Sequence, residues 1–405
     1  MTATFERSWD TWVPAVSDSC ILLDVGTVLS PFEKFSPGRV VIRGDRIEAV
    51  GLSSDVRTPD NAKRFEAPAM TLVPGFIEPH VHGCGGADVM DATPDSMSII
   101  CRTLAQHGTT AFLPTTVSAP VDALSSAIER LAGVIRTPSP GARPLGIHLE
   151  GPFLNVQKRG THQPSHVRLP DATLLSDWIA RSMGTIKLLT IAPELEGSAA
   201  LSSQARETGV VVAMGHSDAS YAQASEAADA GTRYAVHTFN AMRQFNHRDP
   251  GIVGAVLADD RIFAEIIADG IHVAPETVRL FAKVKGPARI LLATDGTSAT
   301  GMPDGEYALG TRTVQVRGGI CRDGEGRLAG STLTQDRALR NLLDWTRMSL
   351  SDALLALTVN PATALSLEGR GRLEPGAFAD LALLDQNLQV ARTYVAGAVV
   401  FDRSA

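Results

Sequence analysis

Between Pro74 and Leu365 short apolar runs alternate with amphipathic stretches, and this alternation limits the possible folds more than any other feature of the sequence. Short runs of apolar residues are typical of buried strands, and several of the amphipathic stretches end at glycine, as helices often do. Eight such runs occur: LVPGFIEPH, TTAFLPTT, PLGIHLE, IKLLTIAPE, VVVAMGH, RYAVHTFN, IFAEIIADG and RILLATDG. They predict an α/β protein with a (β/α)8 barrel, whose site lies at the carboxyl ends of the strands.

An open doubly wound sheet is the competing fold. Such a sheet gathers its ligands at one crevice, whereas here polar residues end nearly every run. No glycine-rich nucleotide loop stands between a strand and a helix, which argues against a dinucleotide enzyme.

The two ends of the sequence have a different pattern from the middle. The segments ILLDVGTVL, GRVVIRGDRIEAV and FEAPAMTLV precede the barrel, and GAFADLALLD and LQVARTYVAGAVVF follow it. Each end has too few strands for a stable sheet of its own. We therefore expect residues 1–73 and 366–405 to form one small, discontinuous β-sandwich domain, with the barrel, residues 74–365, inserted between them.

Charge and cysteine usage limit the partners and the compartment. A net charge of −7 argues against nucleic acid or an anionic membrane as the partner. The first residues carry Glu6 and Asp10 and do not resemble a signal peptide, and no run approaches the roughly 18 apolar residues of a membrane span. The four cysteines lie far apart, which fits reduced thiols in the cytoplasm. Cys84, after HVHG, is either a loop thiol or a group near a metal.

Four polar residues stand where apolar runs end: Glu150, His216, His237 and Asp295. Imidazoles and carboxylates suit a divalent cation such as zinc or iron, with one further carboxylate free to move protons. We assign the metal to Glu150, His216 and His237, and the general base and acid to Asp295. The alternative for Asp295 is a helix cap. The pattern indicates a hydrolytic metalloenzyme.

Three further histidines are candidates for the same site. His80 and His82 stand two apart, so on an extended segment both rings point to one side and could hold a metal together. The alternative is a pair of histidines at the barrel rim without a metal. His162, in KRGTH after Glu150, is placed to polarise a carbonyl.

Substrate contacts are expected from loops after the later runs. The candidates are Asn240, Ala241, Arg248, Asp269, Gly270 and His272. Arg248 and His272 suit a phosphate, because arginine offers a planar set of donors. Either could instead be an ordinary surface residue.

These segments together carry a family resemblance. The motifs LEGPFLN, KRGTH, IAPE, GHSDASY, VHTFNAM, HRDPG, IIADGIHV, LLATDG, LAGSTLT and NPATALSL occur in the order found in N-acetylglucosamine-6-phosphate deacetylases of the amidohydrolase superfamily. From about residue 71 onward the chain resembles that family. The resemblance implies the barrel with a small β-sandwich, and the reaction of N-acetyl-D-glucosamine 6-phosphate with water to give D-glucosamine 6-phosphate and acetate.

The resemblance also implies roles for particular residues. It supports Glu150, His216 and His237 as metal ligands, and Asp295 as the catalytic acid and base. It places Thr161 and His162 at the acetamide, and Leu328, Ala329 and Gly330 in a loop facing the sugar. It further implies an amino-sugar phosphate substrate and a homodimer, in which the neighbouring subunit supplies some phosphate contacts. We expect the ion to be zinc, with iron, cobalt or manganese as the alternatives.

Some questions stay open at this level. Family members differ at HVH, so the number of ions, one or two, is undecided. Phe239 and Gly296 stand where relatives often have tyrosine and alanine, which concerns fine specificity. An amidohydrolase of cyclic amides usually carries a carboxylated lysine ending the fourth strand, but Lys187 comes too early in this sequence. A deacetylase of the galactosamine epimer remains an alternative. A sugar-phosphate sensor without activity would be expected to lack a ligand or Asp295, and none is missing.

Overall fold

Nine short parallel strands form the centre of the larger part of the protein. The computed structural model describes residues 19–138 and 140–404. One sheet has the order β10-β9-β6 and another the order β11-β12-β13-β14-β15-β16. The strands are β6 (Phe76–Val81), β9 (Thr109–Pro114), β10 (Arg143–Pro144), β11 (Ile147–Glu150), β12 (Ile186–Ile191), β13 (Val211–Met214), β14 (Tyr234–Ala235), β15 (Phe263–Ile266) and β16 (Ile290–Leu292). All eight apolar runs of the sequence therefore contain strands, with β10 and β11 sharing one run.

Isolated parallel bridges connect the edges of these two sheets. Thr115 pairs with His148 beside β9 and β11, and Val81 at the end of β6 pairs with Gly296 beyond β16. The carboxyl ends of β6 and β16 therefore lie next to each other. Residues that follow the strands are brought together at this end.

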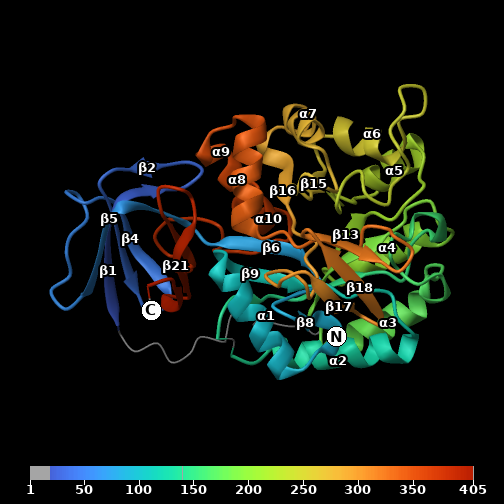
Figure 1. Ribbon diagram of the computed structural model, residues 1–405, viewed down its shortest axis with the longest axis horizontal. Coiled ribbons are helices and arrows are strands. Elements are labelled where there is room, and N and C mark those ends of the chain that lie inside the picture. The colour runs from blue at the N-terminus through green and yellow to red at the C-terminus, as the bar shows by residue number, and fades with distance from the viewer. Residues whose placement is uncertain (1–18, 139, 405) are drawn as a thin grey trace, which may run out of the picture.

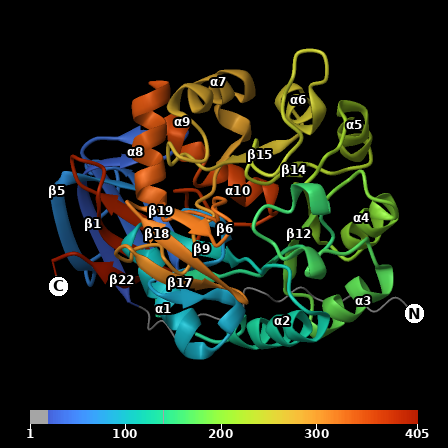
Figure 2. The ribbon, with the colours of Figure 1, turned by 45° about the vertical axis from the view of Figure 1, so that its right-hand side comes forward.

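Helices lie between the strands and around them, as Figures 1 and 2 show. Their starts follow local capping rules: Thr93 and Ser220 make capping boxes, and Asp171 accepts two backbone N–H groups. The helices are α1 (Pro94–Gln106), α2 (Val121–Ile135), α3 (Ala172–Arg181), α4 (Ser198–Glu207), α5 (Tyr221–Asp229), α6 (Gly251–Ala258), α7 (Pro275–Lys285), α8 (Gln335–Thr346), α9 (Leu350–Leu355) and α10 (Val359–Ala364). The first five coincide with amphipathic stretches of the sequence that have a helical pattern, residues 95–108, 121–135, 171–183, 200–209 and 220–231.

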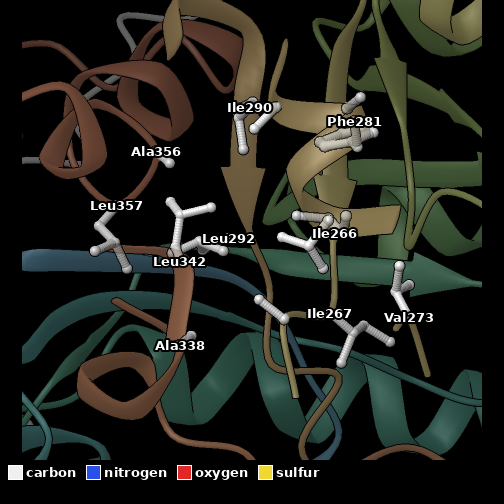
Figure 3. Close-up of a cluster of buried hydrophobic side chains, with 14 of the residues drawn as sticks. Ile266, Ile267, Val273, Phe281, Ile290, Leu292, Ala338, Leu342, Ala356 and Leu357 are labelled. Atoms are coloured by element: carbon white, nitrogen blue, oxygen red, sulfur yellow. The ribbon is translucent and has the colours of Figure 1, made fainter. Parts of the chain in front are cut away.

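One core cluster joins strands to helices and is drawn in Figure 3. Ile266 of β15 and Ile290 of β16 are fully buried against apolar side chains that include Phe281 of α7 and Leu342 of α8. Burying a large aliphatic or aromatic side chain contributes roughly 1.5–3 kcal/mol. This packing fixes the strands whose carboxyl ends carry polar residues.

The two ends of the chain share one sheet, at the left of Figure 1. In this sheet β5 pairs with β20, with Val73 opposite Ala382. The members are β1 (Cys20–Leu29), β2 (Lys34–Phe35), β3 (Gly38–Arg43), β4 (Arg46–Leu52), β5 (Lys63–Pro74), β20 (Leu381–Leu384), β21 (Val390–Val395) and β22 (Ala398–Asp402). Residues 1–18, which we expected to lack a signal peptide and to belong to the small domain, lie outside the described residues. No helix within the described ranges has the length and apolar character needed to cross a membrane.

A three-stranded antiparallel sheet was not anticipated from the sequence. It follows β16 and consists of β17 (Gly305–Leu309), β18 (Arg312–Arg317) and β19 (Ile320–Asp323), and Figure 2 shows it in front of β6 and β9. Arg312 donates to the carbonyl of Thr161 at 2.6 Å, which ties this sheet to the loop after β11. A much smaller pair, β7 (Gly83–Cys84) and β8 (Ala87–Asp88), follows β6.

Lys285, at the end of α7, gives a test of the packing that is independent of function. Its Nζ is buried and donates to the carbonyls of Val256 and Asp259 at 2.9 and 2.8 Å. Burial lowers the pKa of Lys285 to about 8, although Asp260 and Asp259 favour the charged form. Between pH 8 and 10.5 the unfolded chain therefore binds more protons than the folded protein, and this group makes stability rise with pH.

We expect the Lys285→Met variant to lose this contribution. Wild type gains stability from this group between pH 8 and 10, whereas the variant does not. The urea midpoint of the variant should therefore lie further below that of wild type at pH 10 than at pH 8. The Lys283→Met variant, which changes an exposed lysine of the same helix, should follow wild type at both values. A constant difference between Lys285→Met and wild type across this window would contradict the effect.

Candidate active site

The four polar residues at the ends of apolar runs converge at one point. Glu150 is the last residue of β11, and His216, His237 and Asp295 follow β13, β14 and β16 within three residues. Glu150 Oε1 lies 3.2 Å from His216 Nε2 and 3.0 Å from His237 Nε2, and the two nitrogens are 3.1 Å apart. The geometry expected from the strand order is therefore present.

The histidines of β6 approach the same carboxylates. His82 Nε2 lies 3.2 Å from Glu150 Oε2 and 3.1 Å from Asp295 Oδ1. His80 Nε2 lies 3.4 Å from Glu150 Oε1 and 3.6 Å from Asp295 Oδ1. Both rings face one side of the strand, as their spacing predicts.

These atoms are arranged as ligands of a metal would be. A tetrahedral ion with bonds of 2.0–2.1 Å separates its ligand atoms by about 3.3 Å, close to the separations of Glu150, His216 and His237. Two groups, His80 with His82 and Glu150, and Glu150 with His162 and His216, each have ligand atoms within 4.8 Å of one another. His80 Nε2 is buried and has no hydrogen-bond partner among the described residues. The donor set fits one or two divalent cations.

The hydrogen-bond partners of the Nδ1 atoms distinguish the candidate metal ligands His82 and His216 from His162. Nδ1 of His216 faces the carbonyl of Lys158 at 2.9 Å, and Nδ1 of His82 faces the carbonyl of Thr115 at 3.1 Å. Since a carbonyl only accepts, each Nδ1 carries a proton, and each ring turns its Nε2 to the site, where the neutral form would offer a lone pair to a metal. His162 is reversed, because its Nδ1 accepts the backbone N–H of Ser118 at 3.1 Å. Its neutral ring therefore presents an N–H to the site, as a donor to a carbonyl does.

Burial and neighbouring charges set the charge states. Burial lowers the pKa of His216 to about 4, although Glu150 favours the charged form. Burial opposes ionisation of Asp295, but the hydrogen bond from His82 and the charges of nearby imidazoles outweigh it and hold the pKa well below its usual range. The pKa of Glu150 is held low in the same way, chiefly by His80 and His216. Both carboxylates are thus anionic at neutral pH.

The backbone is strained at the same residues. His216, His237 and Asp295 have φ values of 47°, 27° and 49°, and Phe239 and Ala241 have 82° and 52°. Positive φ costs a residue with a side chain roughly 1–3 kcal/mol, and such strain concentrates at functional sites. Hydrogen bonds hold the strained segments, for example from the N–H of Asp295 to the carbonyl of His80 at 3.0 Å.

A pocket opens above these residues. Besides His82, Glu150, His162, His216, His237 and Asp295, it is lined by Val117, Gly160, Thr161, Asn240, Ala241, His272, Leu309, Leu328 and Gly330. Six of the substrate contacts expected from the sequence are in this set: Thr161, Asn240, Ala241, His272, Leu328 and Gly330. Val117, Gly160 and Leu309 were not anticipated. Leu309 lies at the end of β17, a strand that was not predicted from the sequence.

The other expected contacts lie behind or outside the pocket. Asp269 accepts from His272 Nδ1 at 2.7 Å and so orients that ring. Gly270 lies against Trp345, where a Cβ would come within 3.3 Å of the indole, and Ala329 is buried. Arg248 is on an exposed loop and does not line the pocket of its own chain. Cys84 is buried, with Sγ facing the carbonyl of Ile100.

A parallel sheet whose strand ends gather imidazoles and carboxylates in this way defines a metal-dependent hydrolase. The amidohydrolase family model matches residues 71–400. An N-acetylgalactosamine-6-phosphate deacetylase of Escherichia coli O157:H7 is 39% identical over 82% of this chain and 88% of that protein. An N-acetylglucosamine-6-phosphate deacetylase of Vibrio furnissii is 37% identical, covering 88% and 90%.

Solved structures agree with these sequence matches. The N-acetyl-D-glucosamine-6-phosphate deacetylase of Mycobacterium smegmatis superposes with a TM-score of 0.88 at 37% identity, covering 94% of this chain and all of that one. The chain belongs to the amidohydrolase family, among the N-acetylglucosamine-6-phosphate deacetylases. Its architecture is a TIM-barrel-like domain with a small sheet domain. Lys187 is the second residue of β12, at the end away from the site, so it does not take the place of a carboxylated lysine.

Proposed function

We propose that the protein hydrolyses the acetamide of N-acetyl-D-glucosamine 6-phosphate to D-glucosamine 6-phosphate and acetate. The observation that carries the proposal is that His162 has the opposite tautomer to His82 and His216. One N–H donor, on His162, and one anionic carboxylate, Asp295, face the pocket beside the Nε2 atoms of His82 and His216. An acyl group in the pocket meets a donor for its oxygen and an acceptor for the proton of water.

Glu150, His216 and His237 are the residues that would hold the principal ion, and His80 and His82 with Glu150 would hold a second. Imidazoles and carboxylates suit zinc, which is the ion we expect, and iron, cobalt and manganese are the alternatives. When bound, such an ion acts as a Lewis acid and makes water nucleophilic at neutral pH.

The chain's own residues complete the reaction. Asp295 accepts a proton from the attacking water as the new C–O bond forms, and returns it to the nitrogen as the C–N bond breaks. His162 donates its Nε2–H to the acetyl oxygen, whose negative charge grows in the transition state. The products are acetate and a free amine, so atoms and protons balance.

Substrate recognition follows the lining of the pocket. Thr161 is assigned to the acetamide, Asn240, Ala241 and His272 to the sugar phosphate, and the loop of Leu328, Ala329 and Gly330 to the sugar, with Asp269 and Gly270 behind His272. No lysine or arginine of the described residues lines the pocket. This supports a homodimer in which Arg248, on its exposed loop, reaches the phosphate in the neighbouring subunit's site.

We also propose that the two domains have the closed barrel and the β-sandwich expected from the sequence. Residues 74–365 would form a closed (β/α)8 barrel, which the bridge between Val81 and Gly296 supports. Residues 1–73 with 366–405 would form the small β-sandwich. A cytoplasmic location stays a prediction of the sequence.

Acetate release from three substrates tests the function. N-Acetylglucosamine 6-phosphate should be hydrolysed far faster than the sugar without phosphate, because the phosphate supplies binding energy. N-Acetylgalactosamine 6-phosphate is the second candidate, since the E. coli relative carries that name. A higher kcat/KM on the galactosamine substrate would transfer the proposal to that epimer. Equal rates with and without the phosphate would contradict the roles of Arg248 and His272.

Removal of metal is expected to abolish the activity. Dialysis against a chelator should lower kcat by more than about 100-fold, since the Lewis acid is lost, and zinc should restore it. Metal content by mass spectrometry and acetate release are measured on the same samples. Unchanged turnover in a sample shown to be metal-free would contradict a metal-dependent reaction.

A further inference from the structure

Glu265 lies beneath the candidate metal ligands and contacts two of them. Its Oε2 is 3.0 Å from His80 Nδ1 and accepts the backbone N–H of His237 at 3.0 Å. The hydroxyl of Tyr234 donates to Oε1 at 2.6 Å. Glu265, Tyr234 and His80 are all completely buried, and neither Glu265 nor Tyr234 is among the described residues that line the pocket. The carboxylate is therefore placed to act on ligands and not on substrate.

The partner of Nδ1 distinguishes His80 from the other rings. His82 and His216 donate to backbone carbonyls, which are neutral, whereas His80 donates to a carboxylate. A carboxylate in this position fixes the tautomer and raises the basicity of the opposite nitrogen. His148 packs edge-on against the His80 ring, with centroids 4.6 Å apart, and further restricts its rotation. In the neutral ring that would bind a metal, the Nε2 of His80 is thus a fixed and electron-rich donor.

We propose that Glu265 is a positioning residue that makes His80 the strongest imidazole donor of the group His80, His82 and Glu150, and thereby determines whether this group holds a second ion. The hydroxyl of Tyr234 holds the other carboxylate oxygen, so that Oε2 stays turned to His80. The inference rests on the proposed metal-dependent function and adds to it the residue that controls the number of ions.

The Glu265→Gln variant removes the charge and keeps the shape. The amide oxygen of the glutamine can take the place of Oε2 and still accept from His80 and His237. Its NH2 group then faces Tyr234 and can donate to that hydroxyl after the hydroxyl turns. We expect the affinity for the second ion to fall about 10- to 100-fold, the usual effect of losing such a partner. Zinc titration calorimetry of metal-free protein, and metal content after dialysis at limiting zinc, should give two ions for wild type and one for the variant.

A matched control is Glu78→Gln. Glu78 is also completely buried, but its oxygens accept from the backbone N–H groups of His80 and Thr294 and from Gln335, and they contact no imidazole. This variant should keep both zinc affinities.

The outcomes separate the inference from the proposed function. Wild-type affinity for both ions in Glu265→Gln, or a wild type that holds one ion and is fully active, would overturn the inference alone. A wild type that binds no ion and retains activity would overturn the metal-dependent function. If Glu265→Gln does not fold, Tyr234→Phe decides the question: weaker binding of the second ion supports the inference, and unchanged binding overturns it.

Discussion

Replacing Asp295 by asparagine should lower kcat for deacetylation by about 10²- to 10⁴-fold, the usual contribution of a general acid or base. The amide has the shape of the carboxylate, and it can still hydrogen-bond to His82, whose Nε2 lies 3.1 Å away. It cannot take a proton from water or return one to the leaving nitrogen. Since Asp295 is not among the residues assigned to the principal ion, metal content and KM should change far less than kcat.

The measurements are acetate release, metal content and the melting temperature on one preparation. Asp385→Asn is the control, because Asp385 accepts from Asn387 and Gln389 in the turn between β20 and β21, outside the pocket. Full activity in Asp295→Asn would contradict the assigned role. A parallel loss of metal and activity would instead make Asp295 a ligand.

The Glu150→Gln variant should lose both metal and activity. Its carboxylate is the centre of the site, within 3.0–3.4 Å of the Nε2 atoms of five rings: His80, His82, His162, His216 and His237. Because the charge of a direct ligand is removed, metal affinity should fall by more than the 10- to 100-fold typical of an outer partner. We expect activity to fall at least as far, because the Lewis acid is lost with the ion.

Metal content after gel filtration checks this expectation, with Glu78→Gln as a control for the replacement of another buried acidic side chain, whose pKa burial raises to about 8. Added zinc should restore wild type after chelation but not Glu150→Gln. A variant that keeps its full metal content would show that the histidines hold the ion without Glu150. Circular dichroism excludes unfolding as the cause.

The sequence predicted the positions of the site residues because strand ends are regular. Glu150, His216, His237 and Asp295 follow buried apolar runs, and parallel strands bring such residues to one end of a sheet. The prediction needed only the order of strands and helices. The pairing of the two chain ends was predictable for a similar reason, since neither end has enough strands to form a sheet alone.

Glu265 could not be found in the same way. It lies between Ala264 and Ile266 in the run IFAEIIADG, and one polar residue in an apolar run does not reveal its partner. The contact with His80 depends on how distant strands close around the interior. The donor role of His162 was proposed from its loop, but the reason lies in the N–H of Ser118, which only the folded structure places beside it.

The strand β17 and its neighbours were missed for another reason. The segment TRTVQVRGGICRD alternates as an antiparallel hairpin does, but the repeated pattern of strands and helices that predicts the barrel has its last strand at Asp295 and does not include this segment. Leu309 was therefore absent from the predicted pocket. The position of Arg248 also required the structure, since nothing in HRDPG shows whether the loop faces its own pocket.

The pairing of β5 with β20 has a consequence for biosynthesis. As the chain emerges from the ribosome, β5 is complete long before Leu381 and its neighbours are available to pair with it. Until then one edge of β5 carries unsatisfied N–H and C=O groups, and such edges recruit other nascent chains. The C-terminal strands therefore complete a sheet that strands near the N-terminus begin, and premature termination upstream of β20 should yield aggregation-prone polypeptide even when all residues of the active site have been made.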